Sequence, residues 1–600
     1  MAPYSPPVGE MRFVLEDIAG LERIAALPGY DSATPDTVGA VLEEAAGLAR
    51  DVLAPLNDSG DREGARLDNG VVRTPKGFGD AYKAFVAGGW NGLPCDEAYG
   101  GQGLPSVVAA ATSEMWSAAN LGFSLCPMLT MGAVDAIEHH GSAELKALYL
   151  PRLVSGEWTG TMNLTEPQAG SDVGALKTRA VKDGDAWRIA GQKIFITYGD
   201  HDLAENIVHL VLARTPGAPS GTRGISLFLV PKFLPNAHGR PGTRNDVRCV
   251  SLEHKLGIHA SPTAVLAFGD QEGAIGFLIG EEHRGMECMF TMMNNARLHV
   301  GLEGVAISER AYQAALDYAR TRVQGVPVGQ ERGAPIVWHP DVRRMLLLMR
   351  SRTEAARALA YYSAGLLDVA RRSPEAGESQ RARARAELLV PMVKAWSTDL
   401  GVENASLAVQ VHGGMGFIEE TGVAQHYRDA RIAPIYEGTN GIQALDLLGR
   451  KLVRDEGAAA HALIAEMRAL PATPALSRAI DAVEGATRHL LEAWPADPAA
   501  AMAGATPYLT LFATAVGGWL MGKAAAIATD RLRRGEGDAR FLNGKLASAR
   551  FYAGHVLPQT AALQASVRFV RVPQNGNARR QGGAAKIAVE RGQRQAGAQR

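Results

Sequence analysis

The sequence has few cysteines, and they lie far apart. Its 600 residues include four of them, and no two form a CxxC pair: Cys95, Cys126, Cys249 and Cys288. This spacing excludes a zinc knuckle and a dense disulfide framework, and we expect no metal site. It favours a protein of a reducing compartment, the cytoplasm.

The chain also lacks a targeting signal, a long apolar run and an excess of charge of one sign. Its first twenty residues contain no basic segment followed by an apolar one, so no export signal is visible. The nearest candidate for a membrane span, Leu509 to Ala526, is broken by three glycines, and we expect no span. The formal net charge of -1 offers nucleic acid no general attraction, which favours a small-molecule partner.

The hydrophobic pattern predicts several domains and an α+β, mainly α fold. Apolar residues spaced by three and four predict helices before Trp158 and again beyond Gly285, with short segments rich in β-branched residues between them. The expected units are an N-terminal helical domain with an extended N-terminal arm at 1–158, a middle β domain at 159–284, a helical bundle at 285–455, an additional helical domain at 456–570 and a disordered basic tail at 571–600. A nucleic-acid-binding arm is the alternative for the tail.

Three segments combine glycines with polar residues between strongly patterned elements, where backbone amides become available to a ligand. The first is MNLTEPQAGSDVGALKT, in which Thr165 and Ser171 are candidate ligand contacts, although a plain connecting loop is the alternative. The second is AVQVHGGMGF, where a helix ends in glycines that permit the close approach of a pyrophosphate. A simple helix C-cap is the alternative there.

The third segment, RIAPIYEGTNGIQALDLLGRKL, places one carboxylate, Glu437, between an apolar stretch and the start of a helix. A carboxylate against apolar walls loses hydration, so its pKa rises toward the range useful for a general base. A capping role at the helix N-terminus explains the same residue equally well. The pattern by itself leaves both interpretations open.

These segments, in this order, resemble the acyl-CoA dehydrogenase family. The resemblance covers about residues 40 to 450, and its most specific motifs are TEPQAGSD at 165–172, GQKIFIT at 191–197, LGIHASPT at 256–263 and YEGTNGIQ at 436–443. It implies the acyl-CoA dehydrogenase fold: a helical domain, a β domain and a helical bundle, here with an additional C-terminal helical domain.

The resemblance implies FAD as cofactor and assigns a role to each candidate residue. Glu437 would be the catalytic base, taking the α-proton of an acyl-CoA while a β-hydride passes to FAD N5 and a trans-2-enoyl-CoA forms. The implied cofactor contacts are Leu164, Thr165, Ser171, Phe195, Thr197, Arg322, Gln410, Gly413, Gly414 and Thr439. The implied substrate contacts are Ser171, Asn294, Arg297, Tyr436 and Gly438. Arg322 would reach the FAD of a neighbouring subunit, so a homodimer or tetramer is expected.

Two positions depart from the family pattern: Gln168 replaces the usual glycine, and Phe195 replaces the tryptophan stacked on the flavin. Phe195 still offers an aromatic ring for stacking, so we expect flavin binding to survive. The added C-terminal domain resembles the branch that includes 3-(methylthio)propanoyl-CoA dehydrogenases. The candidate substrates are therefore 3-(methylthio)propanoyl-CoA and short or medium acyl-CoAs of fatty acid metabolism, with an electron-transfer flavoprotein as electron acceptor. An acyl-CoA oxidase and a non-catalytic, nucleic-acid-binding relative are the alternatives.

Overall fold

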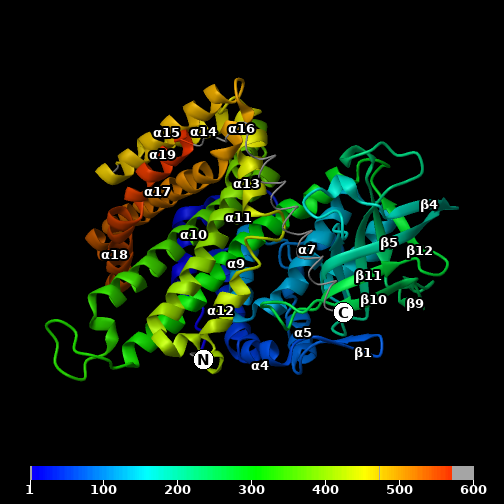
Figure 1. The fold of residues 1–600 in the computed structure, drawn as a ribbon, viewed down its shortest axis with the longest axis horizontal. Helices are drawn as coiled ribbons and strands as arrows, with labels where there is room; N and C mark the ends of the chain where they lie inside the picture. Colours follow the sequence, from blue (N-terminus) through cyan, green and yellow to red (C-terminus); the bar gives the residue numbers. More distant parts are fainter. Residues whose placement is uncertain (1–2, 472, 570–600) are drawn as a thin grey trace, which may run out of the picture.

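The computed structural model describes residues 3–471 and 473–569, and most of them are helical. The predicted tail at 571–600 lies outside the described residues. Figure 1 shows a large helical body on the left and a β domain on the right, joined along the N-terminal helices. The predicted α+β, mainly α architecture is confirmed.

The N-terminal region is built from helices whose starts follow ordinary capping chemistry. Asn120 accepts a hydrogen bond from the backbone N–H of Phe123, and Ser142 accepts one from Leu145. The elements are α1 (Val8–Phe13), α2 (Leu21–Ala25), α3 (Pro35–Leu48), α4 (Pro55–Glu63), β1 (Arg66–Asp68), β2 (Val71–Arg73), α5 (Phe78–Ala87), α6 (Ser106–Ala119), α7 (Leu121–His140) and α8 (Ala143–Ser155).

The middle region is a curled sheet in the order β10-β11-β5-β12-β7-β6-β3, with β4 also paired to β5. Every residue of β6 and β7 is buried, as expected for strands covered on both faces. The strands are β3 (Trp158–Asn163), β4 (Arg179–Asp183), β5 (Ala186–Thr197), β6 (Asn206–Ala213), β7 (Ser226–Pro231), β10 (Val247–Leu252), β11 (Thr263–Phe268) and β12 (Ala274–Ile279), beside a separate ribbon of β8 (Phe233–Pro235) and β9 (Pro241–Arg244).

The bundle after the sheet depends on close contact between its long helices. A Cβ on Gly301 or Gly304 of α9 would lie 2.5 Å or less from Val393 or Ser397 of α11, so only glycine lets these helices approach so closely. The elements are α9 (Gly285–Thr321), α10 (Pro340–Arg372), α11 (Ala376–His412), α12 (Val423–Ala430) and α13 (Asn440–Asp446).

The C-terminal region packs on α10 and α11 at the left of Figure 1. Its central helix α17 is continuous, so the three glycines do not interrupt it, and Gly517 instead allows contact with Trp396. The elements are α14 (Ala458–Ala469), α15 (Pro474–Ala493), α16 (Pro498–Ala503), α17 (Ala505–Arg534), α18 (Ala539–His555) and α19 (Thr560–Phe569).

Two of the described helices, α7 and α17, are long and apolar enough to cross a membrane by length and composition alone. The structure buries 78% and 72% of their apolar windows against other parts of the chain. Burial of this extent is typical of core helices in a globular protein.

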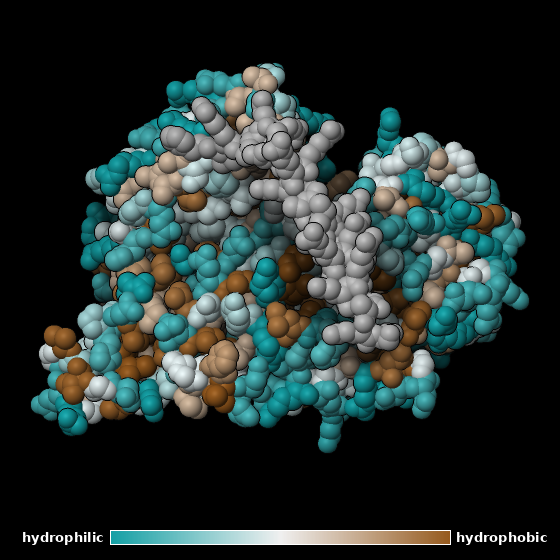
Figure 2. Space-filling model, viewed as in Figure 1, coloured by the Kyte–Doolittle hydropathy of each residue, from teal (hydrophilic) through white to brown (hydrophobic). Residues whose placement is uncertain are grey.

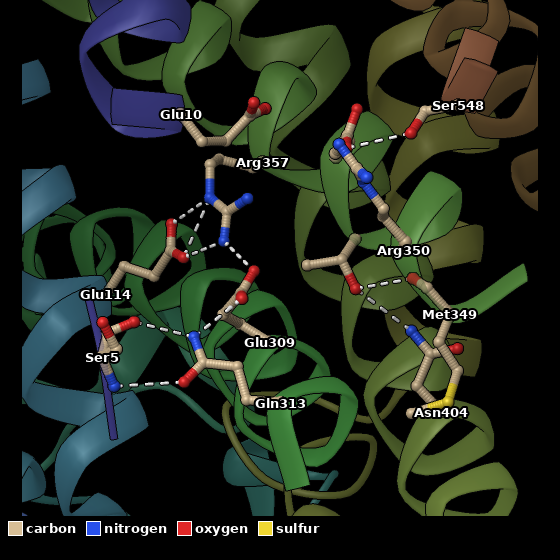
Figure 3. A network of polar contacts seen from close by, with 12 residues as sticks. Ser5, Glu10, Glu114, Glu309, Gln313, Met349, Arg350, Arg357, Asn404 and Ser548 are labelled. Carbon is tan, nitrogen blue, oxygen red and sulfur yellow. Dashed lines mark hydrogen bonds and ion pairs between the residues drawn. The ribbon is translucent and has the colours of Figure 1, made fainter. Parts of the chain in front are cut away.

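A network of buried charges ties the N-terminal arm and the added C-terminal region to the bundle. Arg357 of α10 donates to both oxygens of Glu114 at 2.7 to 3.1 Å and to Glu309 at 2.8 Å (Figure 3). Lys545 of α18 donates to Glu10 at 2.7 Å and to Glu354 at 2.9 Å. Two groups of buried ion pairs thus join regions that are far apart in the sequence.

Candidate active site

The ends of β3 and β5 lie together and carry most of the predicted flavin contacts. Leu164 and Thr165 follow β3, while Phe195 and Thr197 end β5. The backbone N–H of Ile194 donates to the Thr165 carbonyl at 2.9 Å, which joins the two segments. Ser171 lies farther along the same loop and is exposed.

A buried ion pair fixes this pair of segments. Lys193 of β5 is fully buried and donates to the Leu164 carbonyl at 3.0 Å and to the Glu166 carboxylate at 2.9 Å. Burial lowers the pKa of Lys193 to about 8, against the effect of Glu166. Burial alone would raise the pKa of Glu166, but Lys193 and the hydrogen bonds from Thr178 outweigh it and hold that pKa at about 2. Both groups are therefore charged near neutral pH.

Phe195 is pushed outward by an irregularity in β5. The register against β11 gains one residue between Lys193 and Ile196, and Phe195 adopts φ 60° with 58% of its surface exposed. A positive φ is unfavourable for a bulky residue and is often found at functional sites. Nearby, the buried hydroxyl of Thr263, paired with Thr197 across the strands, has no hydrogen-bond partner among the described residues. An exposed ring beside polar groups fits a flavin, which has an apolar and a polar edge.

The carboxylate predicted as base lies in a strained turn between α12 and α13. Glu437 has φ 55° and the following Gly438 has φ 81°. The left-handed region costs a non-glycine residue about 1–3 kcal/mol. Thr439 is the N-cap of α13, accepting from the Ile442 N–H at 3.2 Å. The capping role considered for Glu437 therefore belongs to Thr439, which was predicted to contact the cofactor.

The turn is anchored on α11 and on its own helix. Lys394 donates to the Gly438 carbonyl and to Asn440 Oδ1, each at 2.9 Å. Gln443 Nε2 donates to the Glu437 carbonyl at 3.1 Å. These contacts hold the backbone and leave the Glu437 carboxylate available.

The electrostatic environment of Glu437 suits a general base. Burial raises its pKa from 4.5 to about 7, although the nearby cations Arg297 and Lys394 lower it. Burial lowers the pKa of Lys394 to about 8. Arg297 is 5% exposed and pairs with Asp446 at 3.3 Å. A carboxyl with a pKa near 7 exchanges protons readily at neutral pH.

A cavity of about 500 Å³ lies between α6, α7, α9 and α11, and two of the predicted substrate contacts, Asn294 and Arg297, line it. Asn294 is exposed, whereas Arg297 is buried. One wall is aromatic and rich in sulfur: Trp90, Cys95, Trp116, Met128 and Met131. Charged side chains contribute to the rest of the lining: Asp135, Glu138, Arg371, Arg383, Glu387, Asp446 and Lys451.

The remaining predicted cofactor residues lie at another end of the bundle. Tyr318 and His412 stack with ring centroids 4.2 Å apart, which brings the end of α9, with Arg322, beside the end of α11. Gly413 is the C-cap of α11 at φ 61°, and a Cβ on Gly414 would meet nothing within 4 Å. Gln410, Gly413 and Gly414 are all exposed.

Figure 1 shows this end of the bundle, with the α9–α10 connection, on the side away from the β domain. Apolar residues gather at the same end in Figure 2. The exposed ones include Val326, Val328, Met415 and Phe417. One chain thus presents the two halves of the predicted FAD site on separate parts of its surface.

The sequence did not identify Lys394 and Glu303, two buried groups that contact the turn around Glu437. Lys394 and Glu303 each stand as a lone charge in an apolar helical stretch, LLVPMVKAWST and LHVGLEGVAIS. Such a charge is costly to bury unless it is paired, and this was the available signal.

Models of known families match the chain almost end to end. "Acyl-CoA dehydrogenase, N-terminal domain" matches residues 36–157, "Acyl-CoA dehydrogenase, middle domain" residues 161–271 and "Acyl-CoA dehydrogenase, C-terminal domain" residues 283–452. "Acetyl-CoA dehydrogenase C-terminal like" matches residues 456–570.

Individual relatives agree with the family models. The chain is 49% identical to a 3-methylmercaptopropionyl-CoA dehydrogenase of Ruegeria pomeroyi over 93% of this chain and 97% of that protein. It is 37% identical to a butyryl-CoA dehydrogenase of Syntrophomonas wolfei over 92% and 95%. An acyl-CoA dehydrogenase of Bacillus anthracis complexed with FAD shares the fold at a TM-score of 0.70 and 22% identity, over 92% of this chain and 91% of that chain.

Proposed function

This chain belongs to the acyl-CoA dehydrogenase family, and we propose that Glu437 is the base that removes the α-proton of its acyl-CoA substrate. The reaction class is the FAD-dependent α,β-dehydrogenation of an acyl-CoA thioester. One observation carries the choice of base: Glu437 is held in a strained turn beside Arg297 and Lys394, with its pKa raised by burial to about 7.

The chain's own residues divide the chemistry between them. Glu437 takes the proton from Cα, and Tyr436 beside it shields the reacting carbons from water. Bound FAD supplies the acceptor for the hydride that leaves Cβ, so the product is a trans-2-enoyl-CoA. Thr165, Phe195 and Thr197 would hold the flavin, which fits the exposed ring and the unpartnered hydroxyl found there.

The substrate we propose is 3-(methylthio)propanoyl-CoA. Its support is the 49% identity to a 3-methylmercaptopropionyl-CoA dehydrogenase and the composition of the cavity wall. Cys95 Sγ lies 3.9 Å from Met131 Sδ in that wall, with Trp90 and Trp116 nearby. Soft, polarizable sulfur and aromatic groups suit the thioether of such an acyl chain.

The assembly we propose is a cytoplasmic homodimer or tetramer in which each FAD bridges two chains. Arg322 of one chain would meet the pyrophosphate held by its neighbour, with Gln410, Gly413 and Gly414 near the adenosine. Within the described residues, the exposed side chain of Arg322 makes a single long hydrogen bond, 3.5 Å to Gln324, which leaves its charge accessible. Electrons would leave through an electron-transfer flavoprotein, with neither nucleic acid nor a membrane as partner.

The experiment is an anaerobic titration of the purified yellow protein with butanoyl-, octanoyl- and 3-(methylthio)propanoyl-CoA, followed by visible absorption. We expect the flavin band to bleach at the lowest concentration with 3-(methylthio)propanoyl-CoA. Stronger bleaching by butanoyl- or octanoyl-CoA would overturn the substrate while keeping the reaction. Rapid reoxidation by air would favour the oxidase, and a colourless protein that cannot be reconstituted with FAD would contradict the function.

A further inference from the structure

A buried carboxyl lies beside the proposed base. Glu303 of α9 is 1% exposed, and its Oε2 accepts a hydrogen bond from the hydroxyl of Tyr436. Its Oε1 is buried with no hydrogen-bond partner in the described part of the chain. Tyr436 directly precedes Glu437, so this hydrogen bond connects α9 to the strained turn.

The helix packing explains why a carboxyl can reach this position. Gly301 and Gly304 flank Glu303 and lie against the α11 backbone at Val393 and Ser397. This contact draws α9 toward the segment of α11 that carries Lys394. The turn is thus held by Lys394 at Gly438 on one side and by Glu303 at Tyr436 on the other.

We propose that Glu303 is a positioning residue of the dehydrogenation site: its carboxyl fixes Tyr436, and through Tyr436 it fixes the conformation and the proton affinity of Glu437. This inference rests on the proposed role of Glu437 as the base. The simple alternative is that Glu303 contributes only packing to the helix pair.

Burial favours a neutral Glu303 carboxyl at pH 7. Burial raises its pKa to about 8, assisted by the like charge of Glu437 and opposed by the Tyr436 hydroxyl and Lys394. Above that pH the ionised Glu303 becomes a negative neighbour of Glu437. A like charge increases the proton affinity of a carboxylate, so Glu437 becomes a stronger base.

The test uses the FAD-containing protein and four variants: Glu303→Ala, Glu303→Gln, Tyr436→Phe and Glu287→Gln. Glutamine retains an acceptor for Tyr436 without a charge, and Glu287, exposed on the same helix, is the matched control. The first measurement is amide hydrogen exchange of the peptide covering residues 431–440. We expect Glu303→Ala and Tyr436→Phe to speed its exchange by about tenfold, as a lost hydrogen bond allows, and the other two variants to match the wild type.

The second measurement is the rate of anaerobic flavin reduction between pH 6 and 9. The wild type should show a second increase above pH 8, Glu303→Gln should lack it, and Glu303→Ala should lose about tenfold in rate at an unchanged KM. Unchanged exchange in Glu303→Ala together with identical pH profiles for Glu303→Gln and the wild type would overturn the proposal. If no acyl-CoA reduces the wild-type flavin, the proposed function fails, while the exchange data still decide whether Glu303 positions the turn.

Discussion

The charges around Arg357 and those around Glu437 are both buried, but they differ in how completely they are paired. The carboxylate of Glu114 receives hydrogen bonds on both oxygens from Arg357 and one from Tyr361. Although burial opposes it, Glu114 and Glu309 raise the pKa of Arg357 well above its usual value. Arg357 is therefore held in its charged form.

Around Glu437 the balance is different. Burial raises the pKa of Glu437 to about 7, because Arg297 and Lys394 compensate only in part. It raises the pKa of Glu303 to about 8, where Lys394 compensates only in part. A fully paired buried charge joins elements firmly, whereas an incompletely paired carboxyl remains able to gain or lose a proton. The charges around Arg357 therefore stabilise the fold, whereas those around Glu437 are suited to proton transfer.

The largest expected effect is that of Glu437→Gln on the reaction. Removing the general base should lower the rate of flavin reduction by about 10³–10⁴-fold with FAD still bound. Because the folded pKa lies above the unfolded one, the ionised Glu437 destabilises the protein at pH 8, so the thermal midpoint should stay level or rise. Stopped-flow reduction and thermal unfolding at pH 8 measure both.

The control for this variant is Glu456→Gln, since Glu456 also has a positive φ, 54°, but is exposed. It should leave rate and midpoint unchanged. Retained reduction in Glu437→Gln would assign the base elsewhere.

The converse test is Arg357→Met in the fully paired cluster. Removing one partner leaves the buried Glu114 without its cation, and breaking such a pair costs about 3–5 kcal/mol. We expect a lower unfolding midpoint and an unchanged rate of flavin reduction per folded protein. The exposed Arg344→Met on the same helix is the control. A loss of rate at unchanged stability would show that the network serves the chemistry.

Lys394→Met tests the incomplete pairing directly, because it removes one of the two cations that partly compensate the charge of Glu437. Lys394 lowers the pKa of Glu437, so its removal should move the rising limb of the pH profile of flavin reduction to higher pH by about one unit. The group is active when ionised, hence the rate at pH 7 falls and recovers near pH 9. An unmoved limb would mean that Lys394 does not lower the pKa of Glu437.

The sequence predicted a helical domain, a sheet domain and a helical bundle in this order along the chain. It could do so because helical and strand periodicities differ strongly on either side of Trp158 and Gly285. Arg297, a predicted substrate contact, lines a cavity in the structure, and the contact with substrate stays a prediction. The three glycines between Leu509 and Ala526 argued against a membrane span, yet helix α17 is continuous there and long and apolar enough for one by composition, with Gly517 packed against Trp396.

Other features of the site could not be read from the sequence. The pairs Lys193–Glu166 and Glu303–Tyr436 join residues 27 and 133 positions apart, and such contacts follow from tertiary packing alone. The φ of 60° at Phe195 likewise results from strand register, which no local propensity reports for a phenylalanine.

The smallest expected effect tests whether burial, rather than the number of ion pairs, makes the Arg357 cluster strong. Arg468 in the C-terminal region pairs with Asp481 at 2.7 Å and Glu484 at 2.6 Å, also two carboxylates, but it is 42% exposed. Water already solvates these charges, so Arg468→Ala should cost less than about 1 kcal/mol in thermal unfolding. A loss of stability as large as that of Arg357→Met would mean that the number of ion pairs, and not burial, determines how much such a cluster stabilises the protein. The difference between the Arg357 cluster and the groups around Glu437 could then not be explained by buried pairing.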